Sequence, residues 1–415
     1  MPSEENATWV RSLERPAGIA GVGVACALGV GVEACVERMA SGVGGLKRLD
    51  ELAAGSHADW ALDCRAAWPG GGEGALAGWI GDRLFVEKGR RYGAAANLGL
   101  VAARQAVAEA GWSDSERAGA WIFAGTSRGN AGEVLGQWKR RRPVRKFAAS
   151  NTLHSEVAAA VSIQLGVRGP WQVYSNGCSS GLDALGWAAL AVDAGWVRRA
   201  LVLAVDLPLV PPILDDFAAT GLLGSGRIND PYTEGTDGFH PGEAAAALAL
   251  ESGGGADQGR LSVGGYVCNA DAHDAVALPE EGETVAQCLR GALEGAGGVA
   301  DVAAVCPHAT GTANHRVAEG HALNAVFSGA RKPLLLPLKP QTGHSLGASG
   351  LLDVALLAGW ARQGALPPVL PGLTSPGPGW TLPATPMHWP VGEWVLKLAA
   401  GMGGHNAAVM LRRDA

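Results

Sequence analysis

The sequence predicts an α/β protein whose sheets are buried between helices. Apolar, strand-like segments alternate along its 415 residues with segments whose apolar residues recur at helical spacing. That alternation is typical of sheets that helices cover on both faces. Charged residues make up only 17% of the chain, against an apolar share of 47%, so a large part of the chain is available for burial.

The first half carries the clearest alternation of strands and helices. The apolar stripe of residues 98–111 ends at Gly111, a common residue just past a helix C-terminus. Residues 18–23 have the spacing GxxGxG rather than the GxGxxG of dinucleotide-binding turns, which favours close packing in a buried strand. We expect strands at residues 18–27, 118–124, 171–174 and 199–205, and helices at 31–41, 98–111 and 183–194.

The second half continues the alternation without a clear sequence repeat. Between the halves, Ser252–Gly259 (SGGGADQG) is typical of a surface turn, so we divide the chain into residues 1–255 and 256–415. The proline-rich residues 366–378 predict irregular or extended chain. We expect strands at residues 261–268 and 302–306, and helices at 283–294 and 345–363.

Composition excludes several classes of function. The net charge of −6 argues against a general nucleic-acid binder, and 62 glycines without a Gly-X-Y period exclude a collagen. Seven scattered cysteines without a CxxC pair indicate neither a zinc knuckle nor a thioredoxin-like redox site. No uncharged apolar run reaches 18 residues, and the polar N-terminus is unlike a secretory signal, so we expect a cytoplasmic protein without a membrane span.

Cys178 occupies a position suited to a nucleophile. In YSNGCSSGLDALGWAAL a strand-like stretch leads into the cysteine, and small residues then open a helix. Backbone N–H groups and the helix dipole at such a turn stabilise a thiolate and lower the pKa of the thiol. On this motif alone, a small buried cysteine without chemistry is an equal alternative.

Two histidines follow a similar pattern. His308 ends an apolar strand in VAAVCPHATGTANHR, and His344 precedes a helix rich in small residues in KPQTGHSLGASG, five residues after Lys339. Each histidine alone could be structural, and Lys339 alone could be a solvated charge. One cysteine and two histidines, each at a Gly/Ser/Thr-rich turn, are more than chance would usually place at such turns. This favours a shared catalytic site.

These segments resemble the β-ketoacyl-acyl-carrier-protein synthases, the condensing enzymes of fatty-acid and polyketide assembly. The nucleophile segment YSNGCSSGLDAL, the histidine motif HATGT, the lysine–histidine motif KPQTGHSLGASG and the terminal loop GMGGHNAAVML stand in the family's order. The cysteine and the two histidines are separated by 130 and then 36 residues. The resemblance implies dimers and a thiolase-like fold, in which two similar α/β halves form a five-layered α-β-α-β-α core.

The resemblance also implies roles for the site residues. Cys178 would accept an acyl group, with its own N–H and that of Met402 as the oxyanion hole. His308 and His344 would donate hydrogen bonds to the malonyl thioester oxygen while CO2 leaves and the carbanion attacks the acyl thioester. Lys339 would be the fourth catalytic residue and shape the electrostatics around His308, supported by Glu319 and Asp353. Thr310 and Thr312 would contact the pantetheine arm or the malonyl group.

Three residues depart from the family pattern. Arg316 stands where the family carries an acid, Met402 replaces the gating phenylalanine, and His405 replaces a threonine. No cysteine follows Cys306, which argues against a thiolase, and His344 stands in place of the asparagine of initiating synthases. We therefore expect an elongating but specialised synthase.

A basic run, KRRRPVRK at residues 139–146, stands out in this acidic protein. It is suited to steer an acidic acyl carrier protein to the site, and a solvated loop or a dimer-interface element is an equal alternative. The candidate docking residues are Arg140, Arg141, Arg142, Arg145 and Lys146.

The sequence thus predicts a Cys-His-His β-ketoacyl-acyl-carrier-protein synthase. It would join an acyl group on Cys178 to malonyl-acyl-carrier-protein by decarboxylative Claisen condensation, in fatty-acid, polyketide or polyene-type biosynthesis. Its expected partners are acyl carrier protein and a second synthase subunit, in a homodimer or a heterodimer. The main alternative is a weakly active, chain-length-factor-like partner subunit, and a hydrolase or acyltransferase with the same thiolate is a weaker one. The expected chemistry requires no metal or cofactor.

Overall fold

One large sheet runs through the molecule. The computed structural model of the chain describes residues 8–53, 58–68, 72, 74–81, 92–133, 135, 147–253, 260–295, 298, 301–329 and 331–415. In spatial order the sheet contains β11 (Leu334–Leu335), β10 (Val302–Cys306), β14 (Trp394–Ala400), β15 (His405–Arg413), β9 (Leu261–Ala270), β1 (Trp9–Cys26), β8 (Ala244–Ser252), β7 (Arg199–Asp206), β5 (Trp121–Gly125) and β6 (Trp171–Tyr174), with β2 (Gly29–Val30) paired to β1.

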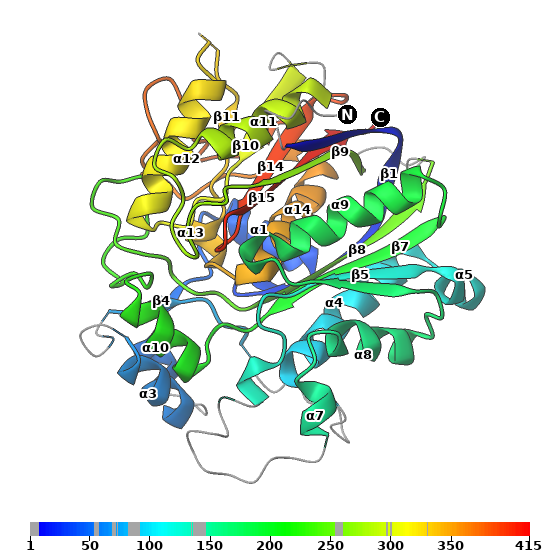
Figure 1. Ribbon diagram of the computed structural model, residues 1–415, viewed down its shortest axis with the longest axis horizontal. Coiled ribbons are helices and arrows are strands. Elements are labelled where there is room, and N and C mark those ends of the chain that lie inside the picture. Colours follow the sequence, from blue (N-terminus) through cyan, green and yellow to red (C-terminus); the bar gives the residue numbers. More distant parts are fainter. Residues whose placement is uncertain are drawn as a thin grey trace.

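The long strand β1 joins the two halves of this sheet. Its first residues pair with β9, where Trp9 lies opposite Cys268, and its last residues pair with β8, where Cys26 lies opposite Ala244. Figure 1 shows two central helices between the sheet halves, α9 (Ser180–Asp193) and α14 (Ser349–Ala361). The outer faces are covered by α4 (Ala94–Ala110) and α8 (Glu156–Leu165) on one side and by α11 (Glu283–Gly295) and α12 (Ala313–Val326) on the other.

Alternation along the strands places their side chains in separate cores. In β7, Leu201 and Leu203 pack in the outer core with α4 and α8, whereas Val202 faces the central core with α9 and α14. In β14, Leu396 packs with α11 and α12, and Val395 faces the same central core. Successive residues of a strand point to opposite faces of the sheet, so both sheet halves are buried on both faces, and the five-layered prediction is confirmed.

Shorter elements complete the fold at several places. One of them is α10 (Pro211–Ala219), whose Phe217 shares an apolar cluster with Cys178. These elements are α1 (Val32–Ala40), β3 (Lys47–Arg48), α2 (Leu49–Ala53), α3 (Ala58–Ala66), β4 (Leu76–Ala77), α5 (Asp114–Gly119), α7 (Ala148–Asn151), α10 (Pro211–Ala219), α13 (Lys339–Thr342), β12 (Ala365–Leu366) and β13 (Met387–His388).

Several predicted elements differ from the structure at their ends. The strand expected at residues 118–124 begins at Trp121, because residues 118 and 119 form the end of α5. β1 begins at Trp9 rather than Gly18, because its charged first residues lack an apolar pattern and are held as a strand by pairing with β9. The helix expected at residues 345–363 is a short 3-10 turn at Leu346–Ala348 followed by α14. The packing explanation of the early glycines is confirmed, since a Cβ on Gly23 would lie 1.9 Å from the carbonyl oxygen of Ala102 in α4.

Within the described ranges, no helix has both the length and the apolar character needed to cross a lipid bilayer. The proposed division of the chain at residues 255 and 256 falls in residues 254–259, outside the described residues, and stays a prediction.

Candidate active site

Cys178 lies on the tight turn between β6 and α9. The turn is a 3-10 segment, Gly177–Ser179, which runs directly into the helix. Gly177 has a φ of 61°, and a Cβ there would lie 3.2 Å from the carbonyl oxygen of Met402, so the turn requires glycine. The loop at Gly401 and Met402 therefore packs against the nucleophile turn, with Cys178 only 5% exposed.

His308 follows the end of β10 in a turn held by a buried acid. The N–H of His308 donates to Glu319 at 2.6 Å, and the N–H of Ala309 donates to the other oxygen of Glu319 at 2.9 Å. Ala309 has a φ of 48°, a conformation that usually requires glycine, so these hydrogen bonds hold a strained turn. The position of the imidazole is thereby fixed by α12.

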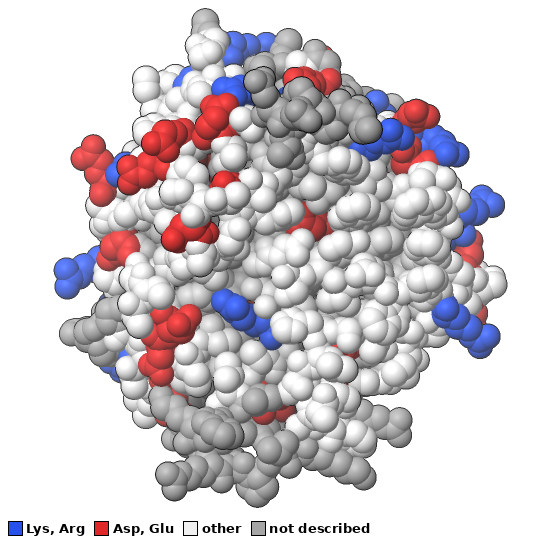
Figure 2. Space-filling model, viewed as in Figure 1, with Lys and Arg blue, Asp and Glu red and all other residues white. Residues whose placement is uncertain are grey.

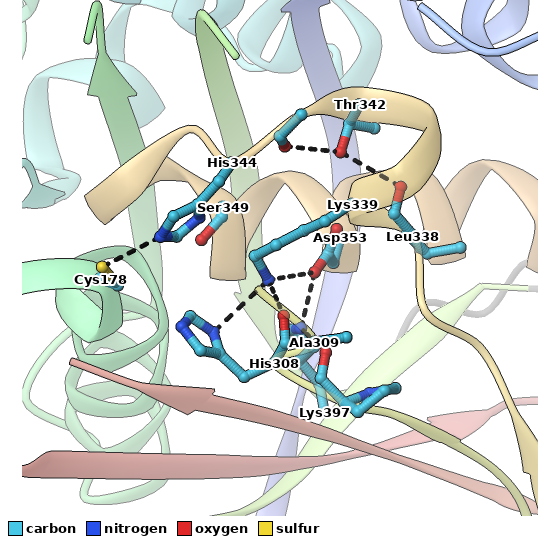
Figure 3. A network of polar contacts seen from close by, with 12 residues as sticks. Cys178, His308, Ala309, Leu338, Lys339, Thr342, His344, Ser349, Asp353 and Lys397 are labelled. Atoms are coloured by element: carbon cyan, nitrogen blue, oxygen red, sulfur yellow. Dashed lines mark hydrogen bonds and ion pairs between the residues drawn. The ribbon is translucent and has the colours of Figure 1, made fainter. Parts of the chain in front are cut away.

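His344 reaches the cysteine from the turn after α13. Its N–H donates to the carbonyl of His240 at 2.7 Å, which anchors the backbone. Its Nε2 lies 3.2 Å from the Sγ of Cys178, and its ring is 5.4 Å from the ring of His308, nearly perpendicular to it. Figure 3 shows the thiol, both imidazoles and Lys339 converging from three segments, since Lys339 and His344 belong to the same stretch around α13.

These side chains open into a cavity of about 60 Å³ with mainly apolar walls. Thr310, Thr312 and Met402 line it, as expected for residues beside the reacting groups. A third histidine, His315, also lines the cavity, and its ring is 4.9 Å from that of His308. The remaining walls are Phe217, Leu222, Phe239, Val276, Leu278, Asn314, Leu346, Ala400 and Gly401.

The expected direction of the cysteine pKa shift is wrong. Burial raises the pKa of Cys178 to about 11, because a thiolate without water is disfavoured. Lys339, the N–H of Met402 and Arg128 each lower the pKa, and buried Asp206 raises it. The N–H of Met402, in the neighbouring loop rather than in the turn itself, does donate to the sulfur, but desolvation outweighs it, so the resting side chain is a neutral thiol.

Both catalytic candidates among the histidines are neutral. Burial lowers the pKa of His308 and of His344 well below the usual value, and the positive charge of Lys339 lowers both further. The Nζ of Lys339 lies 3.4 Å from the Nδ1 of His308 and donates to the carbonyl of the same residue. An ammonium can only donate, so Nδ1 accepts and the Nε2 of His308 carries the proton.

A buried charge network supports this arrangement (Figure 3). Lys397 donates to the carbonyl of Pro307 at 3.0 Å and lies 2.6 Å from Asp353, which is 4.0 Å from Lys339. Burial and the neighbouring Lys397 lower the pKa of Lys339 to about 8. The network therefore places Lys339, whose charge changes as the pH passes its pKa of about 8, beside the Nδ1 of His308.

Family comparison agrees with this geometry. Residues 14–254 match the family described as "Beta-ketoacyl synthase, N-terminal domain", and residues 261–372 match "Beta-ketoacyl synthase, C-terminal domain". The chain belongs to the β-ketoacyl synthase family. It is thus a condensing enzyme of the acyltransferase type.

Three relatives of this synthase illustrate the breadth of the match. The chain is 27% identical over 354 residues to the 3-oxoacyl-[acyl-carrier-protein] synthase 2 of Staphylococcus aureus (strain COL), covering 80% of this chain and 85% of that protein. It is 30% identical over 435 residues to the "Putative polyketide beta-ketoacyl synthase 1" of Streptomyces cyaneus, covering 96% and 98%. The solved structure "The ishigamide ketosynthase/chain length factor" matches with a TM-score of 0.82 at 21% identity, covering 97% of this chain and 100% of that chain. The thiolase-like fold is confirmed by that likeness.

Some residues of the synthase site were not predicted from the sequence. Lys397 lies in the apolar strand segment WVLKLAA, where a lone lysine in a buried pattern was the available signal. No signal in the sequence pointed to His315, seven residues after His308, because the packing of α12 decides whether its ring faces the cavity. Asp206 ends β7 and accepts hydrogen bonds from the loop after β5, a contact between segments 80 residues apart.

The three departures from the family pattern have different surroundings. Arg316 lies on α12 with its Nε buried and without a hydrogen-bond partner, so the acid beside the first histidine is supplied by Glu319 alone among the described residues. Met402 lines the cavity. The Nε2 of His405 lies 3.1 Å from Asp183, which ties the C-terminal loop to α9.

The proposed docking residues Arg140, Arg141, Arg142, Arg145 and Lys146 lie outside the described residues, and their role stays a prediction. Cys178, His308 and His344 bring one sulfur and two ring nitrogens within 4.8 Å of one another. A thiolate and imidazoles at that spacing could also ligate a transition metal, so the expectation of metal-free chemistry needs an experimental test.

Proposed function

We propose that this synthase joins an acyl group on Cys178 to a malonyl thioester by decarboxylative Claisen condensation. The observation that carries the proposal is the 3.2 Å contact between the Sγ of Cys178 and the Nε2 of His344, with neutral His308 in the same cavity. A nucleophile and two neutral donors in one largely dry site fit carbanion chemistry on a thioester.

The first half-reaction loads the enzyme. The sulfur of Cys178 attacks the thioester carbonyl, a new C–S bond forms, and the old C–S bond breaks. The thiol proton passes to the departing pantetheine thiolate, and His344 is placed to relay it. The N–H groups of Cys178 and Met402 would share one oxyanion, and the packing of the Gly401–Met402 loop on the nucleophile turn supports this role.

The second half-reaction forms the carbon–carbon bond. Loss of CO2 from the malonyl group leaves an enolate, whose oxygen would accept hydrogen bonds from His308 and His344. Both imidazoles are neutral, so each carries one ring N–H that can donate a hydrogen bond to the enolate oxygen, and Lys339 adds a nearby positive charge. The carbanion then attacks the acyl thioester, the bond between the acyl carbon and the sulfur breaks, and Cys178 leaves as a thiolate that takes up a proton from water. Glu319 and Asp353 would act by positioning His308 and Lys339, and Thr310 and Thr312 by holding the malonyl or pantetheine group.

The carrier of both substrates is proposed to be acyl carrier protein, which is named in the Staphylococcus relative. A synthase–chain length factor pair among structures of this fold supports a dimer, either of this chain or with a related subunit. The partner-subunit alternative is less well supported, because a subunit without turnover has no need of the paired thiol and imidazole found here.

Intact-mass analysis of purified protein with an acyl-carrier-protein panel and malonyl carrier protein tests the proposal. We expect an acyl adduct and a β-ketoacyl product, both lost in Cys178→Ala and retained in the control Cys268→Ala, whose cysteine lies outside the cavity. Product formation should persist in excess EDTA. An adduct in Cys178→Ala, or thioester hydrolysis without loss of CO2, would overturn the assignment.

A further inference from the structure

Arg128 lies in the loop after β5, with its backbone held in place by Asp206. The carboxylate of Asp206 accepts hydrogen bonds from the N–H groups of Ser127 at 2.8 Å and Arg128 at 2.9 Å. It also accepts from the hydroxyl of Thr126 at 3.0 Å and the N–H of Gly347 at 2.8 Å. Four donors already occupy this carboxylate, and no ion pair joins it to the Arg128 guanidinium among the described residues.

The side chain of Arg128 extends towards the catalytic cavity. Its Cζ lies 5.7 Å from the ring centroid of Phe217, a wall of the cavity that contains Cys178. Phe217 packs edge-on against Phe239 at 5.1 Å, and Phe239 packs edge-on against His344 at 5.2 Å. Three aromatic contacts therefore lead from the catalytic histidine to the guanidinium.

An acyl chain on Cys178 would share this environment. Cys178 belongs to the apolar cluster that contains Phe217, Leu209 and Val210. Leu209 and Val210 also line a second cavity, of about 200 Å³, together with Gly129, the residue after Arg128. The cavity at the thiol measures only about 60 Å³, so space for a longer chain lies on the side where Arg128 stands.

The guanidinium has no polar partner there. Its Nε is buried without a hydrogen-bond partner, and no hydrogen bond or ion pair of the other guanidinium nitrogens occurs within the described part of the chain. An arginine side chain stays protonated and carries five N–H donors in a planar fork. Unsatisfied donors beside apolar walls are costly, and an oxygen acceptor from a ligand would remove that cost.

We propose that Arg128 is a specificity-determining residue that selects acyl chains bearing a keto or carboxylate oxygen over fully saturated chains. The inference rests on the proposed function, since it assumes that Cys178 carries the acyl group. A carbonyl oxygen reaching the guanidinium forms a charge-assisted hydrogen bond, whereas an alkyl chain leaves the fork desolvated and unpaired. Sites built to bind a polar group reject analogues that lack it more strongly than apolar sites reject polar ones.

Rates of Cys178 acylation by six-carbon N-acetylcysteamine thioesters test this inference. The three probes are the hexanoyl, 5-oxohexanoyl and adipoyl thioesters, and intact mass follows the adduct as N-acetylcysteamine thiol leaves. For the unmodified chain we expect the oxygenated probes to react about 10- to 100-fold faster, the range of one charge-assisted hydrogen bond. The two oxygenated probes distinguish a keto from a carboxylate ligand.

Two variants and a control make the result specific to Arg128. Arg128→Met should bring the ratio of the oxygenated to the hexanoyl rates to about one, and Arg128→Lys should keep part of the preference for the adipoyl probe. The exposed Arg331→Met control should match the parent. Arg128→Lys retains the positive charge and a stem of similar length. Comparison of Arg128→Lys with the parent therefore tests the inference even where Arg128→Met folds poorly.

Four other results would overturn the inference. Equal rates for all probes in the parent, or the same ratio in Arg128→Met, would remove Arg128 from substrate selection while leaving the proposed function intact. Equal rates together with dimer dissociation in Arg128→Met, seen by sedimentation, would assign the guanidinium to a partner subunit's acidic group instead. Absence of acylation with every probe would overturn the proposed function itself, and this inference with it.

Discussion

The Nζ of Lys397 lies 2.6 Å from the carboxylate of Asp353, and the two side chains are 0% and 1% exposed. Burial opposes the charge on Lys397, yet Asp353 outweighs it and raises the lysine pKa. Removing one member of a buried ion pair leaves the other charge uncompensated. The pair thus ties β14 to α14 directly behind the catalytic histidine.

Lys397→Met should therefore lower the free energy of unfolding by about 3–5 kcal/mol. Of the cations in the described ranges, Asp353 would keep only the more distant Lys339, at 4.0 Å. The double variant Lys397→Met/Asp353→Leu should regain part of that loss, because it also removes the stranded carboxylate. Urea unfolding of the three proteins measures both effects, and a Lys397→Met protein as stable as its parent would contradict the electrostatic account.

His308→Ala should separate the two half-reactions. Loss of one enolate donor is expected to slow condensation about 10²- to 10³-fold, whereas loading of Cys178 depends on His344 and the backbone donors. Single-turnover mass spectrometry measures the adduct and the product separately. The assignment of His308 fails if loading and condensation fall by the same factor.

The raised pKa of Cys178 predicts the pH dependence of its alkylation. With a thiol pKa of about 11, the thiolate fraction rises about tenfold for each pH unit between 7 and 9. The rate of carboxamidomethylation of Cys178 by iodoacetamide, quantified by peptide mass, should rise by the same factor without a plateau. A plateau below pH 8 would show a stabilised thiolate, the outcome expected from the turn motif alone.

The ion pair between His405 and Asp183 predicts a pH-dependent contribution to stability. Burial opposes protonation of the ring, but the hydrogen bond and charge of Asp183 outweigh it and raise the pKa of His405. A raised folded-state pKa stabilises the protein below the unfolded value of about 6.5, and the contribution is lost as the pH rises through the folded value. His405→Gln should thus cost more stability at pH 6 than at pH 8.5, with the exposed His388→Gln as control. An equal cost at both pH values would be incompatible with the ion pair.

Gly23 tests the close packing of β1 against α4. A Cβ there would lie 1.9 Å from the carbonyl oxygen of Ala102, so the helix or strand would have to move. Gly23→Ala should lower the free energy of unfolding by at least about 1–3 kcal/mol, the usual cost of overpacking. Gly119→Ala is the matched control, because no heavy atom lies within 4 Å of its Cβ. Thermal melts of both variants should differ clearly, and equal melting temperatures would refute the packing argument.

The distribution of charged and aromatic side chains over the surface was the feature least predictable from the sequence. Figure 2 shows a broad face with few charged side chains at its centre and charges mainly around its margin. Exposed Trp187 in α9 stacks on Trp9 at 5.8 Å and on Tyr174 at 6.5 Å. Three segments far apart in the chain make this cluster, so no local pattern could have predicted it.

Local patterns in the sequence predicted most of the central strands and helices and the three turns that carry Cys178, His308 and His344, but they did not predict β8 or β14. Apolar periodicity and small turn residues are local properties, and they can be read from neighbouring positions in the chain. The first residues of β1 were missed for the same reason, because their strand conformation depends on pairing with β9.

The electrostatics of the site depend on the packing of distant segments around it. Burial raises the pKa of Cys178, against the local effect expected from its turn. The packing of distant segments places Lys397 beside Asp353, and it leaves the guanidinium of Arg128, near Phe217, without a polar partner among the described residues. Desolvation depends on every segment that packs around a group, including segments a hundred or more residues away in the chain. A sequence pattern therefore predicts which groups meet, whereas their protonation states and substrate preference follow from what encloses them.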